Sequence, residues 1–354
     1  MRVALIAPPF IPIPPKIYGG TELFLAELAK GLKRLGVEPV VYANGESTID
    51  VEVRSLYQES EWPLKSDIFS SLKDINHTSW ALQDAAGCCD IVQLNNAPGL
   101  ANCRFLNKPV VYTVHHAKEE ELSEFYSYYP EVEFVTISDY QRSRETMPLM
   151  RTIHHGMDPT VYTYQEQKQE YLGFLGRLAP VKGPHLAIEV AKRSGIPLKI
   201  AGEVQPMFRD YFERMVKPHL DGRFIEYLGE ADLALKNELL ANSKALLFPI
   251  QWNEPFGIVL IEAMACGTPV LALPGGSVRE IVCEGVSGHV CENIDAMVER
   301  VRNLDIPARL PRRYMEKFFS TEVMARRYKA LYEEVLARNI SPHPEIAASE
   351  SAAA

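Results

Sequence analysis

The chain has 354 residues, of which 47% are hydrophobic and 23% charged, the composition of an ordinary soluble protein with room for two domains. Its formal net charge of -9 argues against general binding to nucleic acid or to anionic lipid. No apolar run approaches the ~20 residues that a membrane-spanning helix needs. The six cysteines lack the paired spacing of a zinc site, so we expect reduced thiols in a cytoplasmic protein.

In the first half of the chain, short apolar runs alternate with helical patterns. An amphipathic pattern over 21–35 follows a proline-rich loop and ends at Gly36, as a helix would. Apolar runs between such helices are typical of buried parallel strands. We predict strands at residues 3–7, 37–42, 91–94, 110–114, 134–138 and 152–155.

A polar stretch at 164–170 interrupts this alternation and is a natural linker. Further strands are predicted at 171–175, 198–201, 225–228, 245–249 and 270–272, with a long helix over 314–337. The whole pattern predicts an α/β protein in which two Rossmann-like domains, each a doubly wound parallel sheet, face a central cleft. We place the domains at 1–165 and 166–313, a final helix at 314–338 and a disordered tail at 339–354.

The most informative segment places two carboxylates on either side of a helix start. Pro255 disfavours a helical backbone at Glu254, so Glu254 belongs to the loop before a helix predicted over 258–265, and Glu262 lies inside that helix. The backbone N–H groups at a helix N-terminus lack intrahelical partners and can bind an anion. These amides belong to Phe256, Gly257 and Ile258. The layout suggests a nucleotide-sugar site.

Two cations follow the first predicted strand of the second half. Arg177 comes directly after that strand, and Lys182 precedes the next helical pattern. Two fixed cations at the carboxyl end of a strand can neutralise a diphosphate without a metal, although surface exposure is the usual fate of such residues. Gly202 follows another strand and could approach the nucleotide, and a tight turn explains it equally well. The turn at 274–277 precedes a helix and is expected to line the same pocket.

In the first half, Gly19 and Gly20 follow the first strand and open the first helix, where a backbone can approach a ligand closely. A plain turn explains two glycines as well. His115 ends the predicted strand 110–114 and would point into the cleft, where it could hydrogen-bond a sugar or a departing oxygen. The acidic residues 119–121 and the aromatic segment 125–129 suit a sugar or an amine, or an ordinary helix face.

Two other readings of the histidines and glycines carry less weight. A zinc site from His115, His116, His154 and His155 does not follow a known ligand spacing, so we expect no metal. The dinucleotide fingerprint GxGxxG is absent, which counts against a nicotinamide enzyme. Lys30, Lys33 and Arg34 on the first helix could touch a membrane surface, but a half-buried helix explains them better.

Taken in order, these residues resemble the retaining glycosyltransferases of family 4, which have the GT-B fold. The resemblance covers nearly the whole chain and is most specific from Glu254 to Glu262 and on through the sequence to Val270. Further matching features are glycines 19 and 20, His115, the pairs 176–177 and 182–183, residues 201–202 and residues 228–230. The chain departs from the family at His154 and His155, where the family usually has Pro and Asn.

The resemblance implies roles for the matched residues. Glu254 would contact the donor sugar, and Glu262 the ribose. Arg177 and Lys182 would bind the diphosphate, and His115 would lie beside the transferred sugar. The other donor-binding positions would be Gly19, Gly20, Gly202, Phe256, Gly257 and Ile258. The N-terminal domain would bind the acceptor and the C-terminal domain the nucleotide-sugar donor, and the final helix would cross back onto the N-terminal domain.

The expected activity is transfer of a sugar from a nucleotide diphosphate sugar to a hydroxyl acceptor, with retained configuration and no metal or other cofactor. The acceptor would be a carbohydrate, another small molecule or a lipid-linked compound, and the protein a monomer or weak dimer without stable membrane insertion. An epimerase, a phosphorylase or a catalytically silent sugar-nucleotide binder on the same fold are the alternatives. The base, the sugar and the acceptor do not follow from residue types.

Overall fold

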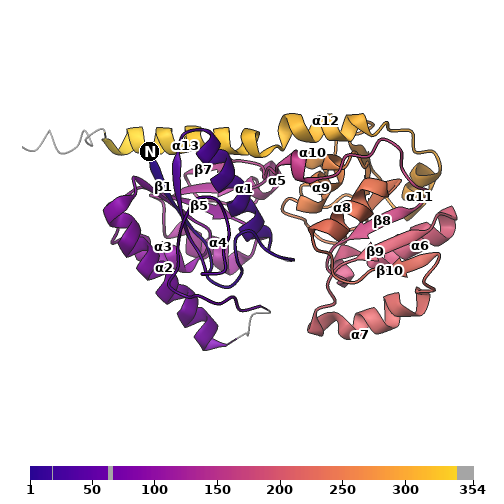
Figure 1. Ribbon diagram of the computed structural model, residues 1–354, viewed down its shortest axis with the longest axis horizontal. Coiled ribbons are helices and arrows are strands. Elements are labelled where there is room, and N and C mark those ends of the chain that lie inside the picture. The colour runs from indigo at the N-terminus through magenta and orange to yellow at the C-terminus, as the bar shows by residue number, and fades with distance from the viewer. Residues whose placement is uncertain (18, 63–66, 341–354) are drawn as a thin grey trace, which may run out of the picture.

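The chain folds into two α/β halves, each built around one all-parallel sheet (Figure 1). The computed structural model describes residues 1–17, 19–62 and 67–340, with only the backbone at 339 and 340. From residue 341 on, the tail predicted at 339–354 lies outside the described residues. The N-terminal sheet has the strand order β3-β2-β1-β4-β5-β6-β7, and the C-terminal sheet has the order β10-β9-β8-β11-β12-β13. The two doubly wound parallel sheets confirm the predicted fold class.

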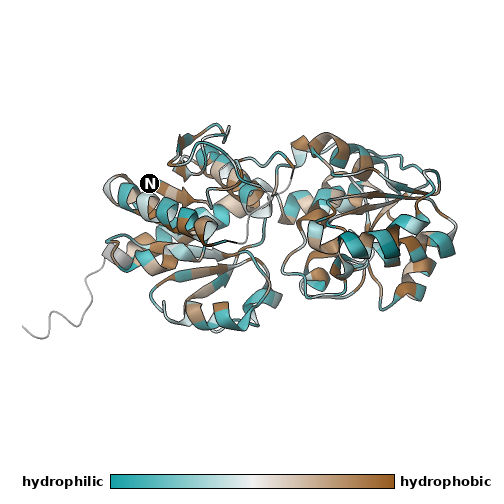
Figure 2. Cartoon of the chain, turned by 90° about the horizontal axis from the view of Figure 1, so that it is seen from below, coloured by the Kyte–Doolittle hydropathy of each residue, from teal (hydrophilic) through white to brown (hydrophobic). Residues whose placement is uncertain are grey.

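The strands are short and buried, as expected when helices cover both faces of a parallel sheet. Hydrophobic clusters lie on both sides of each sheet, and Figure 2 shows hydrophobic residues concentrated on the strands. The N-terminal strands are β1 (Arg2–Ile6), β2 (Glu38–Tyr42), β3 (Glu52–Arg54), β4 (Ile91–Leu94), β5 (Val110–Val114), β6 (Glu133–Thr136) and β7 (Met150–Thr152). The C-terminal strands are β8 (Leu172–Leu175), β9 (Leu198–Ala201), β10 (Ile225–Tyr227), β11 (Ala245–Phe248), β12 (Val270–Ala272) and β13 (Gly288–Val290).

Most predicted strands agree with these bounds within two residues. The exceptions are one strand with a wrong end and two strands that were not predicted. The strand predicted at 152–155 is β7, which ends at Thr152, so His154 and His155 follow the strand instead of ending it. The edge strands β3 and β13 were not predicted. Each spans only three residues, too few for a periodic pattern to stand out.

The helices that connect the strands complete the two layers around each sheet. In the N-terminal half they are α1 (Gly20–Arg34), α2 (Ile68–Cys88), α3 (Pro98–Cys103), α4 (Glu120–Ser127) and α5 (Asp139–Arg142). In the C-terminal half they are α6 (Pro184–Ser194), α7 (Arg209–Tyr211), α8 (Leu233–Asn242), α9 (Ile258–Ala265), α10 (Val278–Ile281), α11 (Ile294–Arg302) and α12 (Arg309–Phe318), and α13 (Thr321–Ile340) ends the described chain.

The single long helix predicted over 314–337 is wrong, because the chain breaks between α12 and α13. At the break, the backbone at Met157 exchanges hydrogen bonds with Phe319 and Thr321, at 3.0 Å each. A side chain at Gly156 would approach the Ser320 carbonyl oxygen to 2.4 Å, so glycine permits this contact. The two segments that connect the halves therefore lie side by side, and their pairing interrupts the helix.

After the break, α13 lies along the N-terminal half, as Figure 1 shows. It packs on α1, where a side chain on Gly31 would meet Ala325 at 2.5 Å. Tyr328 and Tyr332 of α13 are buried and bond to Thr113 and Gln93 of the sheet, at 2.9 and 3.0 Å. The end of the chain thus stabilises the half in which the chain begins.

Both sheets have a point where the strand order reverses direction. In the first sheet β1 lies between β2 and β4, and in the second β8 lies between β9 and β11. Ligands of open α/β sheets bind outside the carboxyl ends of the strands at such points. The loops after β1, β4, β8 and β11 are therefore where a site is expected.

Candidate active site

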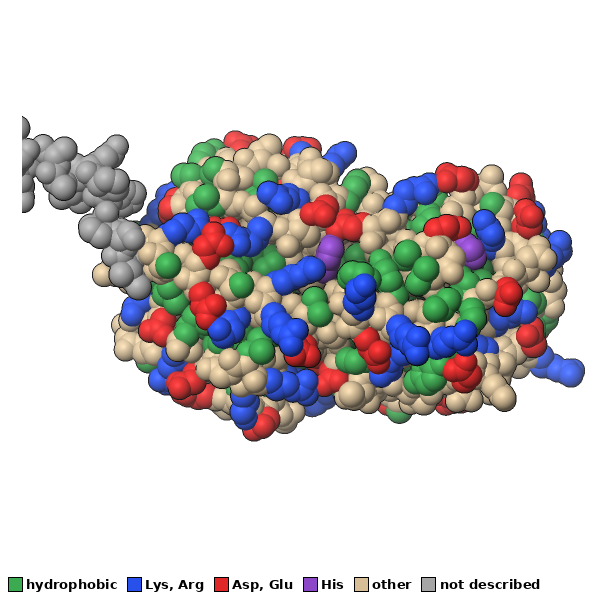
Figure 3. All heavy atoms as spheres, turned by 90° about the horizontal axis from the view of Figure 1, so that it is seen from above, with side chains coloured by type: hydrophobic (Ala, Val, Ile, Leu, Met, Phe, Trp, Pro, Cys, Tyr) green, Lys and Arg blue, Asp and Glu red, His purple; other side chains and the backbone are tan. Residues whose placement is uncertain are grey.

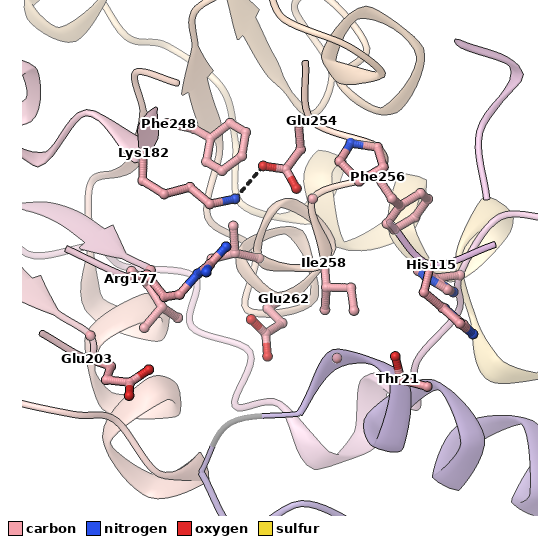
Figure 4. Close-up of a pocket in the computed structure, with 18 of the residues that line it drawn as sticks. Thr21, His115, Arg177, Lys182, Glu203, Phe248, Glu254, Phe256, Ile258 and Glu262 are labelled. Carbon is pink, nitrogen blue, oxygen red and sulfur yellow. Dashed lines mark hydrogen bonds and ion pairs between the residues drawn. The ribbon is translucent and has the colours of Figure 1, made fainter. Parts of the chain in front are cut away.

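A cavity of about 610 Å³ lies between the two halves and is lined by residues of both. Figure 4 shows Arg177, Lys182 and Glu203 on one side of it and Thr21 and His115 on the other. Every site residue predicted from the sequence lines this cavity except Gly19. The two sets of candidate residues, far apart in the chain, are thus brought to one place by the fold.

The loop that carries Glu254 is held by two glycines that allow close backbone contacts. Gly183 has φ +74°, and a side chain there would come within 2.1 Å of the Pro249 carbonyl oxygen. Gly276 has φ +60° and would clash in the same way with the Glu254 carbonyl oxygen, also at 2.1 Å. The turn at 274–277 therefore supports the loop from behind and does not line the cavity, which corrects the prediction.

Glu254 and Lys182 form an ion pair on the wall of the cavity. The Lys182 ammonium lies 2.5 Å from Oε2 of Glu254, and Nε1 of Trp252 donates to the same oxygen at 2.9 Å. The ammonium also lies 4.6 Å from the centre of the Trp252 ring, within cation–π range. Both bonds use Oε2 of Glu254, and no side chain of the described residues bonds Oε1. Oε1 can therefore accept hydrogen bonds from hydroxyl groups of a ligand.

The helix α9 begins at the cavity, as the sequence predicts. Gly257 caps it with φ +83°, and none of the amides of Phe256, Gly257 and Ile258 donates a hydrogen bond to another described residue. The partial positive charge of this helix end and its free N–H groups favour an anion there.

Glu262 lies one turn further along α9 and is buried. Its Oε1 accepts hydrogen bonds from Tyr162 at 3.1 Å and from Lys236 at 3.2 Å. Its second oxygen has no protein partner in the described part of the chain. This leaves one fixed carboxylate oxygen that can accept hydrogen bonds from hydroxyl groups of a ligand.

Arg177 lies in the loop after β8, beside the loops after β9 and β10. These loops pack closely because a side chain on Gly202 would come within 1.8 Å of the Gly176 carbonyl oxygen, and the Gly202 amide donates to Gly229 at 2.8 Å. The Arg177 guanidinium has no hydrogen bond or ion pair within the described chain. It is a cation that lines the cavity and is ready for an anionic ligand.

On the opposite wall, Gly20 begins α1, one residue before the predicted start. A side chain at Gly20 would lie 3.7 Å from Cδ1 of Ile258, so the two halves nearly touch here. Gly19 has φ +149° and does not line the cavity, and a side chain there would come within 2.8 Å of both Pro15 and Glu22. Of the two explanations offered for this glycine, close approach to a ligand and a turn, the turn accounts for Gly19. Tyr18 lies outside the described residues.

His115 follows β5 and lines the cavity, as expected from the sequence. Its ring stacks on that of His155, with centroids 5.6 Å apart and planes 10° apart, and both rings pack against Phe24. Burial holds the pKa of His115 well below its ordinary value, and it lowers the pKa of His155 to about 3. Both imidazoles are therefore neutral near pH 7.

His116 and His154, the other two histidines considered for a zinc site, bond to separate partners. His116 bonds to the Ala117 carbonyl and to the Tyr126 hydroxyl. His154 bonds to the carboxylate of Glu280, which also accepts the backbone N–H groups of Asp139 and Tyr140 at 2.8 and 3.1 Å. Glu280 thus joins α10 of one half to α5 of the other. No cluster of side chains suited to a metal ion occurs in the described ranges.

Several residues of the site were not found from the sequence. Lys236, Tyr162 and Trp252 hold the two key carboxylates, yet each lies in a segment with no local signal. Tyr162 and Lys236 reach Glu262 from distant segments through the packing of the fold, whereas Trp252 belongs to the same loop as Glu254.

The surface outside the site bears charges of both signs on the face that carries α12 and α13. Acidic and basic side chains are intermingled there, as Figure 3 shows. No helix in the described part of the chain is both long and apolar enough to cross a lipid bilayer.

The geometry is matched by comparisons with known proteins. The family model described as "Glycosyltransferase Family 4" matches residues 18–179, and the model "Glycosyl transferases group 1" matches residues 163–313. Together they run from α1 to α12 without a gap.

Curated relatives carry related names. The chain is 25% identical over 243 residues to the putative glycosyltransferase YtcC of Bacillus subtilis, covering 58% of this chain and 59% of that one. It is 28% identical over 183 residues to the D-inositol 3-phosphate glycosyltransferase of Mycolicibacterium smegmatis, covering 46% and 40%. These matches span less than two thirds of the length of either relative.

Solved structures share the fold along the whole chain. The sucrose-phosphate synthase of Thermosynechococcus elongatus superposes with a TM-score of 0.76 at 17% identity, covering 95% of this chain and 99% of that one. Alr3699/HepE of Anabaena, in complex with UDP and glucose, superposes with a TM-score of 0.73 at 18% identity, covering 94% and 100%. These structures show that the fold is shared, and the two family models establish that the chain belongs to the family 4 (group 1) glycosyltransferases of the GT-B fold.

Proposed function

We propose that this protein transfers a sugar from a nucleoside diphosphate sugar to a hydroxyl group of an acceptor, with retention of the anomeric configuration. The observation that carries the proposal is the set of groups at the start of α9. With only the described residues considered, an unpaired guanidinium and free helix amides lie in the same cavity as two carboxylates that each keep one oxygen open. A diphosphate between a sugar and a ribose is a ligand that uses all of them.

The binding roles follow from this arrangement. Arg177 and the amides of Gly257 and Ile258 bind the diphosphate, and Glu262 binds the ribose. Glu254 receives sugar hydroxyls on Oε1, while Lys182 fixes its other oxygen. UDP and glucose bound to HepE, a protein of the same fold, support a donor of this class.

We propose a front-face reaction for the transfer. A double displacement needs a carboxylate nucleophile beside the anomeric carbon. Glu254 accepts hydrogen bonds from Lys182 and Trp252, and Glu262 accepts them from Lys236 and Tyr162. Both carboxylates are therefore held in place to orient the donor substrate. The departing diphosphate would instead take the proton of the acceptor hydroxyl, while the fixed cations stabilise its charge without a metal ion. Closure of the two halves would exclude water from the reaction.

A panel of nucleoside diphosphate sugars, with and without hydroxyl acceptors, tests the proposal. A true donor at ~100 times its dissociation constant should stabilise the fold by ~2.7 kcal/mol. Release of nucleoside diphosphate should depend on the acceptor, and NMR of the product should show the anomeric configuration of the donor. An inverted product would contradict the retaining mechanism.

Two further outcomes would assign a different activity to the same fold. A donor converted to another sugar in the absence of acceptor would identify an epimerase. A donor that binds but is neither transferred nor hydrolysed with any acceptor would identify a silent binder.

A further inference from the structure

Asn95 is a buried asparagine whose side chain joins the ends of two strands to His115. It directly follows β4, at the point where the strand order of the first sheet reverses. Its Nδ2 donates to the Ile6 carbonyl at the end of β1, at 2.9 Å. Its Oδ1 lies 3.0 Å from Nε2 of His115. Because a carbonyl can only accept, the NH₂ group must face Ile6 and the oxygen must face the imidazole.

This orientation decides which nitrogen of His115 carries the hydrogen. The Asn95 oxygen can only accept, so Nε2 must be the protonated nitrogen. A neutral imidazole has one N–H group, which leaves Nδ1 with a free lone pair. The pKa of the ring is held well below its ordinary value because the surrounding protein removes the ring from most of the solvent, and His155 stacks on it, so the ring stays neutral.

The free nitrogen is available to a ligand. Nδ1 of His115 has no hydrogen-bond partner among the described residues. Nδ1 of His155 also lacks a partner but is fully buried, whereas Nδ1 of His115 is not among the fully buried atoms, so a ligand can reach it. The His115 side chain lines the cavity opposite Lys182 and Arg177 (Figure 4). A lone pair directed at a ligand receives a hydrogen bond, and it cannot give one.

We propose that Asn95 is a positioning residue that holds His115 as the Nε2-protonated tautomer, so that Nδ1 accepts a hydrogen bond from a hydroxyl group of the bound sugar. The second part of this inference rests on the proposed function. It excludes the other role that His115 could have, because the one hydrogen of the neutral ring is on Nε2 and is donated to Asn95, so Nδ1 has none to donate to the departing diphosphate oxygen. His115 therefore contacts the sugar and leaves the charge on the diphosphate to Arg177.

The neighbouring Asn96 provides a matched control. It is buried to the same extent as Asn95, each with 7% of its surface exposed. Its side chain bonds to Asp74 and Thr78, both at 2.7 Å, and does not reach His115. The Asn96→Ala variant thus removes a buried amide from the same loop without changing the partner of His115.

The first arm of the test is ¹⁵N NMR of histidine-labelled, ligand-free protein, with His115 assigned from the His115→Gln variant. The wild type and Asn96→Ala should both show His115 neutral with hydrogen on Nε2. Asn95→Ala should show a mixture of tautomers, and Asn95→Asp should keep the Nε2 hydrogen and raise the pKa of the ring. Hydrogen on Nδ1 in the wild type, or an unchanged tautomer in Asn95→Ala, would overturn the assignment. If Asn95→Ala does not fold, the wild-type spectrum and Asn95→Asp decide it.

The second arm measures binding of a nucleoside diphosphate sugar and of the bare nucleoside diphosphate. Loss of one hydrogen bond should weaken the sugar nucleotide roughly 2–10-fold in Asn95→Ala and leave the bare nucleotide unchanged. Equal weakening of both ligands, or the same pattern in Asn96→Ala, would contradict a role in orienting His115 toward the sugar. If no sugar nucleotide binds the wild type, the proposed function fails, and the NMR arm still decides the tautomer.

Discussion

The two walls of the cavity differ in their chemistry. The C-terminal wall carries three cations, Arg177, Lys182 and Lys236, together with the open end of α9. Among the described residues of the N-terminal wall there is no lysine or arginine, and the imidazoles of His115 and His155 are neutral. Because the N-terminal wall has no cation among its described residues and carries the carboxylate of Glu119, we expect an anionic group of a ligand to bind the C-terminal wall.

The three cations of the C-terminal wall differ in whether a carboxylate of the protein pairs with them. Lys182 and Lys236 are each paired with a carboxylate, whereas Arg177 has no partner among the described side chains. A paired cation contributes less to a new ligand because its charge is already partly neutralised. We therefore expect the unpaired guanidinium to contribute most to stabilising a departing diphosphate.

Replacing Arg177 should have the largest effect. The Arg177→Ala variant should lower turnover by ~10²–10³-fold, because it removes a preorganised group that stabilises the developing charge. Initial rates of nucleoside diphosphate release measure this. Arg193→Ala is the matched control, since Arg193 pairs with Glu189 and Asp295 on the surface and does not line the cavity. Near-normal turnover in Arg177→Ala would show that the diphosphate lies elsewhere.

Glu262→Gln should weaken nucleotide binding by ~10–100-fold, as expected for losing a charged hydrogen-bond acceptor for the ribose. The free oxygen of Glu262 is the basis of this expectation, and calorimetry can measure it. A nucleotide with a dideoxyribose lacks the partner hydroxyls, so the substitution should hardly change its affinity. The same loss for both nucleotides would mean that Glu262 acts through the packing of α9.

The N-terminal wall predicts a smaller effect, which concerns the pH dependence of stability. The pKa of His155 falls from 6.5 to about 3 in the folded state because the ring is buried. The folded protein excludes a proton that the unfolded chain binds, so this stability is complete above pH 6.5 and is lost as the pH falls below it. From about pH 7 to about pH 5 the loss should be about 2 kcal/mol.

The His155→Asn variant isolates this term, because asparagine does not titrate. Denaturant unfolding at both pH values should show a wild type that loses about 2 kcal/mol more than the variant. The constant cost of the substitution cancels in this difference. Equal losses in the two proteins would contradict a neutral, buried His155.

The same contrast explains which parts of the site could be predicted from the sequence. The start of α9 follows from local signals, a proline after Glu254 and an apolar run ended by Gly267, and the structure places the helix where it was predicted. Arg177 and Lys182 likewise follow from their positions after a strand and before a helix. These residues of the C-terminal wall are encoded within short segments and could be named without the fold, whereas Lys236 and Trp252 of the same wall could not.

The N-terminal wall depends on contacts between distant segments. Asn95 meets His115 only because β4 and β5 are neighbours, and His155 stacks on His115 only because β7 ends three residues earlier than predicted. Likewise, the break before α13 arises from pairing between Met157 and the residues on either side of Ser320, which are more than 160 positions away in the chain. Local periodicity contains no information on such contacts.

A crystal structure of the protein with a bound nucleoside diphosphate sugar tests the central claim most directly. We expect the diphosphate oxygens within hydrogen-bond distance of the Arg177 guanidinium and of the Gly257 and Ile258 amides, with the sugar between Glu254 and His115. A diphosphate bound away from the start of α9, or an Arg177 side chain turned out of the cavity, would contradict it.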